Sequence, residues 1–265
     1  MAIALSFAST PDDQAVSIAT APGLNPGMGN FTVVFHAKWA VGAPLVDFSR
    51  PISKRQLPSV QSPSYEVWTR VRGAAPNQVL VLEGAVYDEA GNGVFLSAPF
   101  AADIRDGLWH QWAIVFVRGT PNDGLLLFRD HVADTIGEAA TVGAISPTGP
   151  LIIGAAASNE VGEYNSGVVC EIANVWIVPR ALHWDELAQY ANLYLTSVDA
   201  TAWWKLNEGA GLICADSKGA NGGTLAAPDN TPTWDTDAGH SLVYPGAGEM
   251  HNVTVEDMRI EVTQP

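Results

Sequence analysis

Basic residues are scarce in this sequence. Its 265 residues include 13 lysines and arginines against 28 aspartates and glutamates, which gives a formal net charge of -15. Because binding to nucleic-acid phosphates requires clustered lysine and arginine, this balance argues against nucleic acid as a partner. The densest basic stretch is residues 50–55, and Arg70 and Arg72 follow it. We expect these basic side chains to be solvated, on a loop and on one face of a strand.

Long apolar segments are also missing. No window approaches the roughly 20 apolar residues of a membrane-spanning helix, so we expect no membrane insertion. The first residues have neither the basic start nor the apolar stretch of a signal peptide. The sequence therefore predicts synthesis in the cytoplasm, and a role in a virion or outside the cell would be reached by lysis or on a particle.

Cysteine is nearly absent, with Cys170 and Cys214 as the two examples. One pair in a chain of this length is no disulfide framework, and no C-x-x-C spacing indicates a metal site. Cys170 follows two valines, which favours a buried and unreactive thiol. Whether the two cysteines pair stays open at this stage.

What the sequence does contain is a series of strand-like segments separated by turns. The strongest are residues 31–39, 65–72, 78–83 and 109–118. The segment 109–118 is almost continuously apolar, as expected of a central strand covered on both faces. Glycine, proline, asparagine and aspartate fill the gaps between segments. Many short strands with frequent turns predict an all-β sandwich or barrel.

One helix and one tail complete the predicted architecture. Residues 183–194 place apolar side chains at helical spacing, with Asp185 and Glu186 in the first turn, where the helix dipole favours acids. We place one domain at residues 1–239 and a C-terminal extension at 240–265. Within the extension, residues 252–263 read as a strand that either completes the domain's own sheet or serves as an assembly arm.

Five sequence segments, taken together, resemble a known family. They are LSF (5–7) with DDQAVSI (12–18), DGLWHQWAI (106–114), LLLFRD (125–130), EIANVWI (171–177) followed by RAL (180–182) and DEL (185–187), and AWWKLNEGAG (202–211) followed by ADS (215–217). Their types and order are similar to those of laminin-G-like domains of the concanavalin A-like lectin and glucanase superfamily. One departure is His131, which stands where the family pattern has glycine.

This resemblance implies a two-sheet antiparallel jelly-roll sandwich with one short helix, which we expect to cap an open end of the sandwich. It also shows what is missing. Pentraxin relatives bind calcium through acidic and amide residues after a strand like residues 151–154. Here Ala155, Ala156 and Ala157 follow, so a double calcium site of that type is not expected.

The sequence does not favour catalysis. Glycoside hydrolases with this fold need two carboxylates across a cleft, and relatives carry an E-x-D-x-x-E pattern that is absent. We interpret Glu160 and Glu163, and the tail acids Glu256, Asp257 and Glu261, as solvated surface residues. His110 pairs with no serine or cysteine nucleophile and is expected to be structural. We therefore predict a protein that is not an enzyme.

The candidate binding residues lie on one predicted strand. In residues 65–72, Trp68, Arg70 and Arg72 alternate with Val67 and Val71, so they share one face. If that face is outward, the tryptophan ring and the arginine donors form a platform for a glycan. The alternative is that the faces are reversed and Trp68 belongs to the core, since tryptophan is highly buried on average.

Calcium is the candidate cofactor. Asp12 and Asp13 near the first turn, or Asp216 with Asn221, would supply hard oxygen ligands from loops. The alternative is turn chemistry, because aspartate and asparagine bond to their own backbone.

Two functional hypotheses follow. The first is a bacteriophage virion component of the decoration or receptor-binding type. The absence of a secretion signal, the low charge, a jelly roll that begins almost at Met1 and the tail beyond it favour this hypothesis. Its partners would be other virion proteins, itself as a homo-oligomer, and surface glycans. The second is a carbohydrate-binding, lectin-like module of an extracellular protein, and a glycoside hydrolase ranks third.

Overall fold

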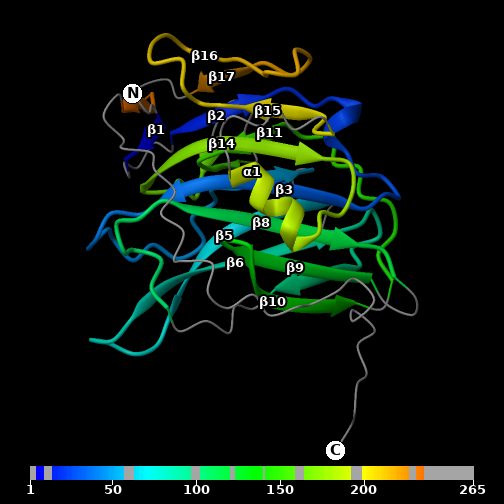
Figure 1. The fold of residues 1–265 in the computed structure, drawn as a ribbon, viewed down its shortest axis with the longest axis horizontal. Coiled ribbons are helices and arrows are strands. Elements are labelled where there is room, and N and C mark those ends of the chain that lie inside the picture. Colours follow the sequence, from blue (N-terminus) through cyan, green and yellow to red (C-terminus); the bar gives the residue numbers. More distant parts are fainter. Residues whose placement is uncertain are drawn as a thin grey trace, which may run out of the picture.

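Antiparallel strands account for most of the structure, a computed structural model that describes residues 4–8, 14–56, 63–96, 102–119, 123–139, 141–158, 164–191, 199–226 and 231–235. Within these residues the strands form two large sheets that pack face to face (Figure 1). This arrangement is the predicted jelly-roll sandwich. The proposed boundary at residue 239 and the tail strand lie outside the described residues and remain predictions.

The first sheet contains the longest central strands. In spatial order its members are β10 (Val132–Ala139), β9 (Asp123–Arg129), β8 (His110–Val117), β3 (Phe31–Lys38), β14 (Cys170–Val178), β1 (Ala4–Phe7) and β18 (Thr233–Asp235), with β15 (Ala202–Trp204) also paired to β14. Strand β8 lies between β9 and β3 and is buried along almost its whole length, so the prediction of a central strand at 109–118 is confirmed.

The second sheet carries the candidate binding residues. Its order is β16 (Ile213–Cys214), β17 (Gly223–Ala226), β2 (Ala15–Ile18), β11 (Leu151–Ile153), β4 (Ile52–Arg55), β5 (Ser64–Arg72), β6 (Val79–Tyr87) and β7 (Gly93–Leu96). The short turn η1 (Pro22–Leu24) and a small hairpin of β12 (Ala156–Ala157) and β13 (Tyr164–Asn165) complete the described elements.

The core fills the space between the two sheets with large apolar side chains. Phe31 of the first sheet and Tyr65 of the second approach to 5.2 Å between ring centres. The hydroxyl of Tyr65 donates to the carbonyl of Leu24 at 3.0 Å, so its polar atom is satisfied inside the core. Trp39 and Trp112 meet edge to face at 6.4 Å. These contacts fix which face of each strand points inward.

Helix α1 (Trp184–Ala191) begins with a capping interaction, because the carboxylate of Glu186 accepts a hydrogen bond from the backbone N–H of His183 at 2.9 Å. Leu187 then packs on outward-facing apolar residues of the first sheet, including Val34 and Ala113. The side chain of Gln111 donates to the carbonyl of Leu187 at 3.1 Å. The expectation that the helix caps an open end is therefore wrong. The first sheet has an apolar outer face, and burying it draws the helix there.

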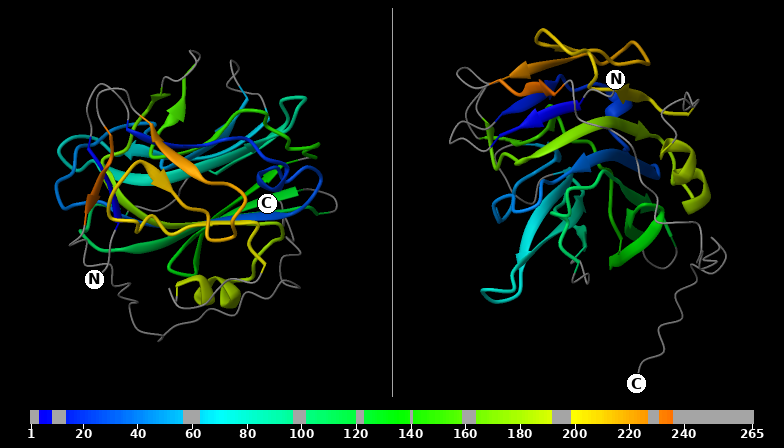
Figure 2. Two further views of the ribbon diagram at one scale, coloured as in Figure 1. Left: turned by 90° about the horizontal axis from the view of Figure 1, so that it is seen from above. Right: turned by 60° about the vertical axis from the view of Figure 1, so that its left-hand side comes forward.

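The helix makes the two outer faces of the sandwich unequal. Viewed from above, α1 lies outside the first sheet, on the side away from β5 and β6 (Figure 2). It is the one α-helix among the described residues. The outer face of the second sheet has no helix on it within that part of the chain, so its side chains are the natural candidates for ligand contacts.

Candidate functional site

Strand β5 divides its side chains between the core and the outer face of the second sheet. Tyr65 and Val67 belong to the core between the sheets, and Val71 packs against it. Because neighbouring residues on a strand point to opposite sides, Trp68, Arg70 and Arg72 lie on the outer face. The predicted alternation is confirmed by this placement, and the alternative with Trp68 between the sheets is not what the structure shows.

Trp68 is nevertheless well covered, with only 7% of its surface exposed. Its ring centre lies 5.5 Å from that of Phe95 on β7, and Phe95 is 47% exposed. Glu83 stands directly opposite Trp68 on β6. The indole Nε1 is buried and has no hydrogen-bond partner among the described residues. A buried N–H without an acceptor is costly, which makes this atom a candidate donor to a ligand.

The two arginines predicted beside Trp68 are held by acids. Arg70 reaches the carboxylate of Asp47 at 3.2 Å and lies over the ring of Phe48, with 4.4 Å between the guanidinium carbon and the ring centre. Arg72 forms an ion pair with the fully buried Glu83. Both arginines remain partly exposed. They rim the aromatic pair, and their positions are fixed by these partners.

Residues 50–55 differ from the solvated loop that the sequence predicts. The side chains of Arg50 and Arg55 are only 15% and 11% exposed. Lys54 is fully buried on the opposite face and donates to Thr20 and to the carbonyls of Pro147 and Gly149. Burial lowers the pKa of Lys54 to about 8. Lys54 points between the sheets because it stands opposite the core residue Tyr65, and Ala157 and Ser166, in and beside the β12–β13 hairpin, cover Arg55 and Arg50.

Glu66 organises the two arginines of β4 and the loop before it. Its carboxylate accepts from Arg50 Nε at 3.0 Å and from Ser53 Oγ at 3.1 Å, and Arg55 Nε lies 3.8 Å away. Arg50 also donates to Ser166 Oγ at 2.8 Å, and Arg55 donates to the carbonyl of Ala157. Burial lowers the pKa of the Arg55 guanidinium; the Glu66 carboxylate opposes this shift and the Arg50 charge adds to it.

The face therefore includes residues that the sequence reasoning missed. Glu66 and Glu83 come from adjacent strands, with Ala85 opposite Glu66 and Trp68 opposite Glu83. Phe95 joins them from β7. The alternation of residues 65–72 already placed Glu66 on the face of Trp68. Strand β5 pairs with β4 and β6, and β6 pairs with β7; this strand order brings in Arg50, Arg55, Glu83 and Phe95.

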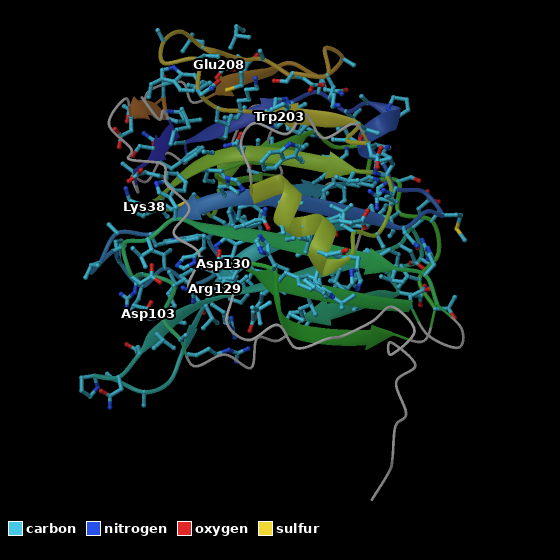
Figure 3. All side chains as sticks on the ribbon, viewed as in Figure 1. Lys38, Asp103, Arg129, Asp130, Trp203 and Glu208 are labelled. Atoms are coloured by element: carbon cyan, nitrogen blue, oxygen red, sulfur yellow. The ribbon has the colours of Figure 1, made fainter. Side chains whose placement is uncertain are left out.

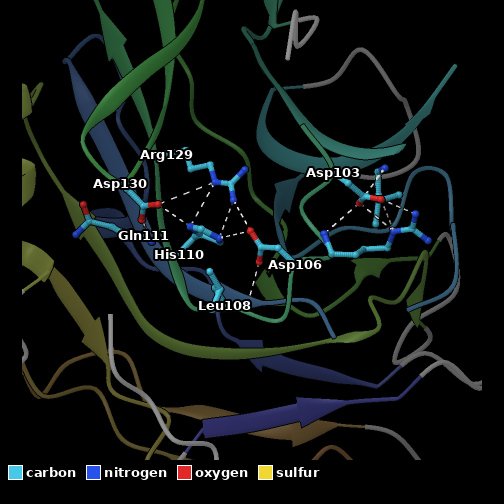
Figure 4. A network of polar contacts seen from close by, with 9 residues as sticks. Asp103, Asp106, Leu108, His110, Gln111, Arg129 and Asp130 are labelled. Atoms are coloured by element: carbon cyan, nitrogen blue, oxygen red, sulfur yellow. Dashed lines mark hydrogen bonds and ion pairs between the residues drawn. The ribbon is translucent and has the colours of Figure 1, made fainter. Parts of the chain in front are cut away.

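His110 belongs to a separate polar network at one end of the first sheet (Figure 4). Its Nδ1 lies 2.5 Å from Asp130 and its Nε2 lies 2.8 Å from Asp106, and Arg129 reaches Asp106 at 2.7 Å. Figure 3 places Arg129 and Asp130 on the same side of the molecule as Lys38 of β3. Burial lowers the pKa of His110, but the hydrogen bond and charge of Asp130, helped by Asp106 against the charge of Arg129, raise it overall. The network ties a turn to two strands, which agrees with a structural role.

The carboxylate of Asp216 accepts hydrogen bonds from backbone N–H groups and from one side-chain amide. One oxygen accepts from the N–H groups of Trp203 and Lys218, each at 2.9 Å. The other accepts from Ala220 N at 3.3 Å and from Asn221 N and Nδ2 at 3.0 and 3.1 Å. These bonds are the turn chemistry that the sequence offered as the alternative to a calcium site. Asp12 and Asp13 lie outside the described residues, so calcium there stays a prediction.

Within the described ranges no group of three or more histidine, cysteine, aspartate or glutamate side chains is arranged to hold a metal ion. Cys170 and Cys214 are both buried and free, and burial raises the pKa of each thiol. In the part of the chain that the structure describes, no helix has the length and apolarity to cross a membrane. Glu160, Glu163 and the tail acids lie outside the described residues.

Comparison with known proteins gives structural neighbours only. No protein-family model matches the sequence, and neither does any curated protein. A Bacteroides ovatus protein described as carbohydrate-binding matches with a TM-score of 0.60 and 13% identity, over 89% of this chain and 60% of that protein. The chain thus corresponds to under two thirds of that neighbour.

Two further neighbours come from an animal and a virus. A heptameric SAP-like pentraxin from Limulus polyphemus matches with a TM-score of 0.55 and 12% identity, over 85% of this chain and 95% of the pentraxin. The enzymatically active domain of tailspike protein 2 from bacteriophage CBA120 matches with a TM-score of 0.50 and 12% identity, over 76% of this chain and 29% of the other. Identities this low show the fold alone, and that fold is the concanavalin-like jelly roll that the sequence motifs predicted.

Proposed function

We propose that this chain is a non-catalytic glycan-binding protein, and that the glycan lies on the outer face of the second sheet around Trp68 and Phe95. The observation that carries the proposal is the contact between the half-exposed Phe95 and the well-covered Trp68, with Arg70 and Arg72 on the same face, which α1 leaves open. Aromatic rings pack against the C–H surface of sugars, and arginine supplies directed donors to oxygen atoms. The likeness to a protein described as carbohydrate-binding supports the proposal.

The acids on this face fit a binding role better than a catalytic one. Glu66 and Glu83 are diagonal neighbours on adjacent strands, a spacing of about 7–8 Å that glycoside hydrolases also use. In such enzymes one carboxyl group donates a proton and the other acts on water or the sugar. Here Glu66 is engaged by Arg50 and Ser53, and Glu83 by Arg72. These contacts make the two acids part of the framework that positions the arginines.

We further propose that the protein works as a homo-oligomeric component of a bacteriophage particle. The low content of charged residues and the fold likeness to a tailspike domain support this setting, and the heptameric pentraxin shows that the fold is compatible with closed oligomers. The alternative is a lectin-like module of an extracellular protein. The two settings share the same binding face.

Glycan binding is tested with an array of neutral and acidic oligosaccharides and purified protein. We expect the wild type to retain at least one class of glycan and Phe95→Ala to bind it about fivefold more weakly. A wild type that binds none of them would reject the proposed function. The setting is tested separately by light scattering: a defined homo-oligomer supports the particle component, and a monomer that still binds glycan supports the lectin-like module.

A further inference from the structure

We infer that the bound saccharide carries an anionic group, a carboxylate or a sulfate, and that Arg55 and Arg50 bind this group next to Trp68. This inference rests on the proposed function and names the ligand class for the same face. It concerns two arginines outside the platform that the sequence predicted.

The distribution of charge in the chain favours this inference. The chain has a net charge of -15 and contains nine arginines. Four of the nine, Arg50, Arg55, Arg70 and Arg72, contact acids on the outer face of β4–β6 or at its border. Their carboxylate partners there number three among the described residues, namely Asp47, Glu66 and Glu83. Among the described residues, an acidic protein thus concentrates an excess of arginine on the outer face of the second sheet.

The excess of arginine lies at Arg50 and Arg55. Arg70 and Arg72 each have a carboxylate of their own, whereas Arg50 and Arg55 share Glu66. The better geometry belongs to Arg50, at 3.0 Å, while Arg55 Nε stays 3.8 Å from the same carboxylate. Among the described residues, two covered guanidinium groups face one acid, which leaves one positive charge without a carboxylate of its own, and burying an uncompensated charge is unfavourable. An anion beside Arg55 would remove that cost.

Unsatisfied hydrogen-bond donors also favour this inference. Arg55 Nε is buried and has no hydrogen-bond partner among the described residues, and the same is true of Trp68 Nε1. Glu66 and Trp68 are two residues apart on one strand face, about 7 Å. A single sugar unit spans that distance. A ring packed beside Trp68 and Phe95 can therefore present an oxyanion to Arg55, whose planar guanidinium suits bidentate contact with carboxylate and similar groups.

The experiment compares polysaccharides that differ in their anionic groups. One pair is polygalacturonate and its methyl ester, and the other is dextran sulfate and dextran. Binding is measured by calorimetry at about 20 mM and about 300 mM salt, where screening of exposed charges differs strongly. We expect the acidic member of at least one pair to bind about tenfold more tightly, with the pair identifying carboxylate or sulfate as the group recognised.

Variants then locate the effect. We expect Arg55→Gln to weaken binding of the acidic polymer about tenfold and Arg55→Lys to restore part of it, since lysine keeps the charge but loses the planar fork. Lys218→Gln is the matched control, because it makes the same charge change on an exposed loop between β16 and β17, at the other end of the second sheet. Melting curves confirm that each variant is folded.

The outcomes separate the inference from the proposed function. Equal binding of the acidic and neutral members, with binding still weakened by Phe95→Ala, would overturn the inference and leave the proposed function standing. Unchanged binding of the acidic polymer by Arg55→Gln would also overturn it. If Arg55→Gln does not fold, Arg55→Lys and the salt dependence of the wild type decide. A wild type that binds no glycan of any kind would remove both.

Discussion

The ring centres of Trp68 on β5 and Phe95 on β7 lie 5.5 Å apart, although β6 separates their strands. The two residues differ in access, since Trp68 is 7% exposed and Phe95 is 47% exposed. Phe95 is therefore the more accessible ring of the pair, and Trp68 packs against it.

Removing either ring should weaken glycan binding. We expect Phe95→Ala to cost about 1 kcal/mol of binding free energy, with little change in melting temperature because the ring is half exposed. Trp68→Ala should weaken binding by a similar amount and also lower the melting temperature, since more buried surface is lost. Leu108→Ala, at another equally exposed apolar residue, is the control and should change neither. Normal binding by a folded Trp68→Ala variant would exclude the platform.

The protein should release no reducing ends from laminarin, agarose, xyloglucan or carrageenan. The physical reason is that Glu66 and Glu83 are both engaged by arginines. Reducing-sugar assays over long incubation measure this directly. Turnover of any of these polymers that disappears in Glu66→Gln or Glu83→Gln would reclassify the face as an active site.

Asp216 should be important for stability. Its carboxylate accepts five N–H hydrogen bonds, from Trp203, Lys218, Ala220 and Asn221. We expect Asp216→Ala to lower the free energy of unfolding by about 3 kcal/mol, because buried donors lose a charged acceptor. Urea denaturation measures the change, and Glu208→Ala, on an exposed residue nearby, is a suitable comparison.

The hydrogen bonds of Asp216 also lead to a prediction about calcium binding. Since both oxygens of Asp216 already accept hydrogen bonds, we expect EDTA to leave the melting temperature of the wild type unchanged. A fall on chelation that calcium reverses would contradict this expectation. Asp12→Asn and Asp13→Asn would then show whether the predicted first-turn ligands are responsible.

The His110 network should make part of the stability depend on pH. The folded protein raises the pKa of this histidine above its ordinary value of about 6.5. A raised pKa means that the folded state binds the proton more tightly, so the contribution is complete below about pH 6.5 and is lost as the pH rises through the folded pKa. We expect His110→Gln to destabilise the protein more at pH 5.5 than at pH 8.5, in urea titrations at both values. An equal loss at both would show that His110 contributes without its charge.

Deletion of residues 240–265 tests the predicted assembly arm. We expect a folded protein, with an unchanged circular dichroism spectrum, that no longer forms the oligomer of the full chain. Light scattering gives the mass of both. Unfolding of the truncated chain would instead show that the strand at 252–263 completes the domain's own sheet.

The sequence predicts the fold well because the signals for it are local. Alternation in residues 65–72 gave the faces of β5, and the apolar run at 109–118 gave a central strand. The prediction failed where the answer depends on contacts between distant segments. Residues 50–55 read as solvated because Ala157 and Ser166, which contact Arg55 and Arg50, lie 102 and 116 residues further along the chain. The predicted position of α1, at an open end of the sandwich, was wrong because the apolar outer face of the first sheet is assembled from β3, β8, β9 and β14.

The binding face is also simple in its connectivity. Strands β4, β5, β6 and β7 follow one another in both sequence and space, whereas the first sheet interleaves strands from across the whole chain. A continuous stretch of about fifty residues, from Asp47 to Leu96, therefore carries the aromatic pair and all four arginines. Under the proposed function, changes confined to that segment would alter ligand preference while the first sheet keeps its strand order. Ligand specificity would then evolve, or be transferred to another protein, through this one segment.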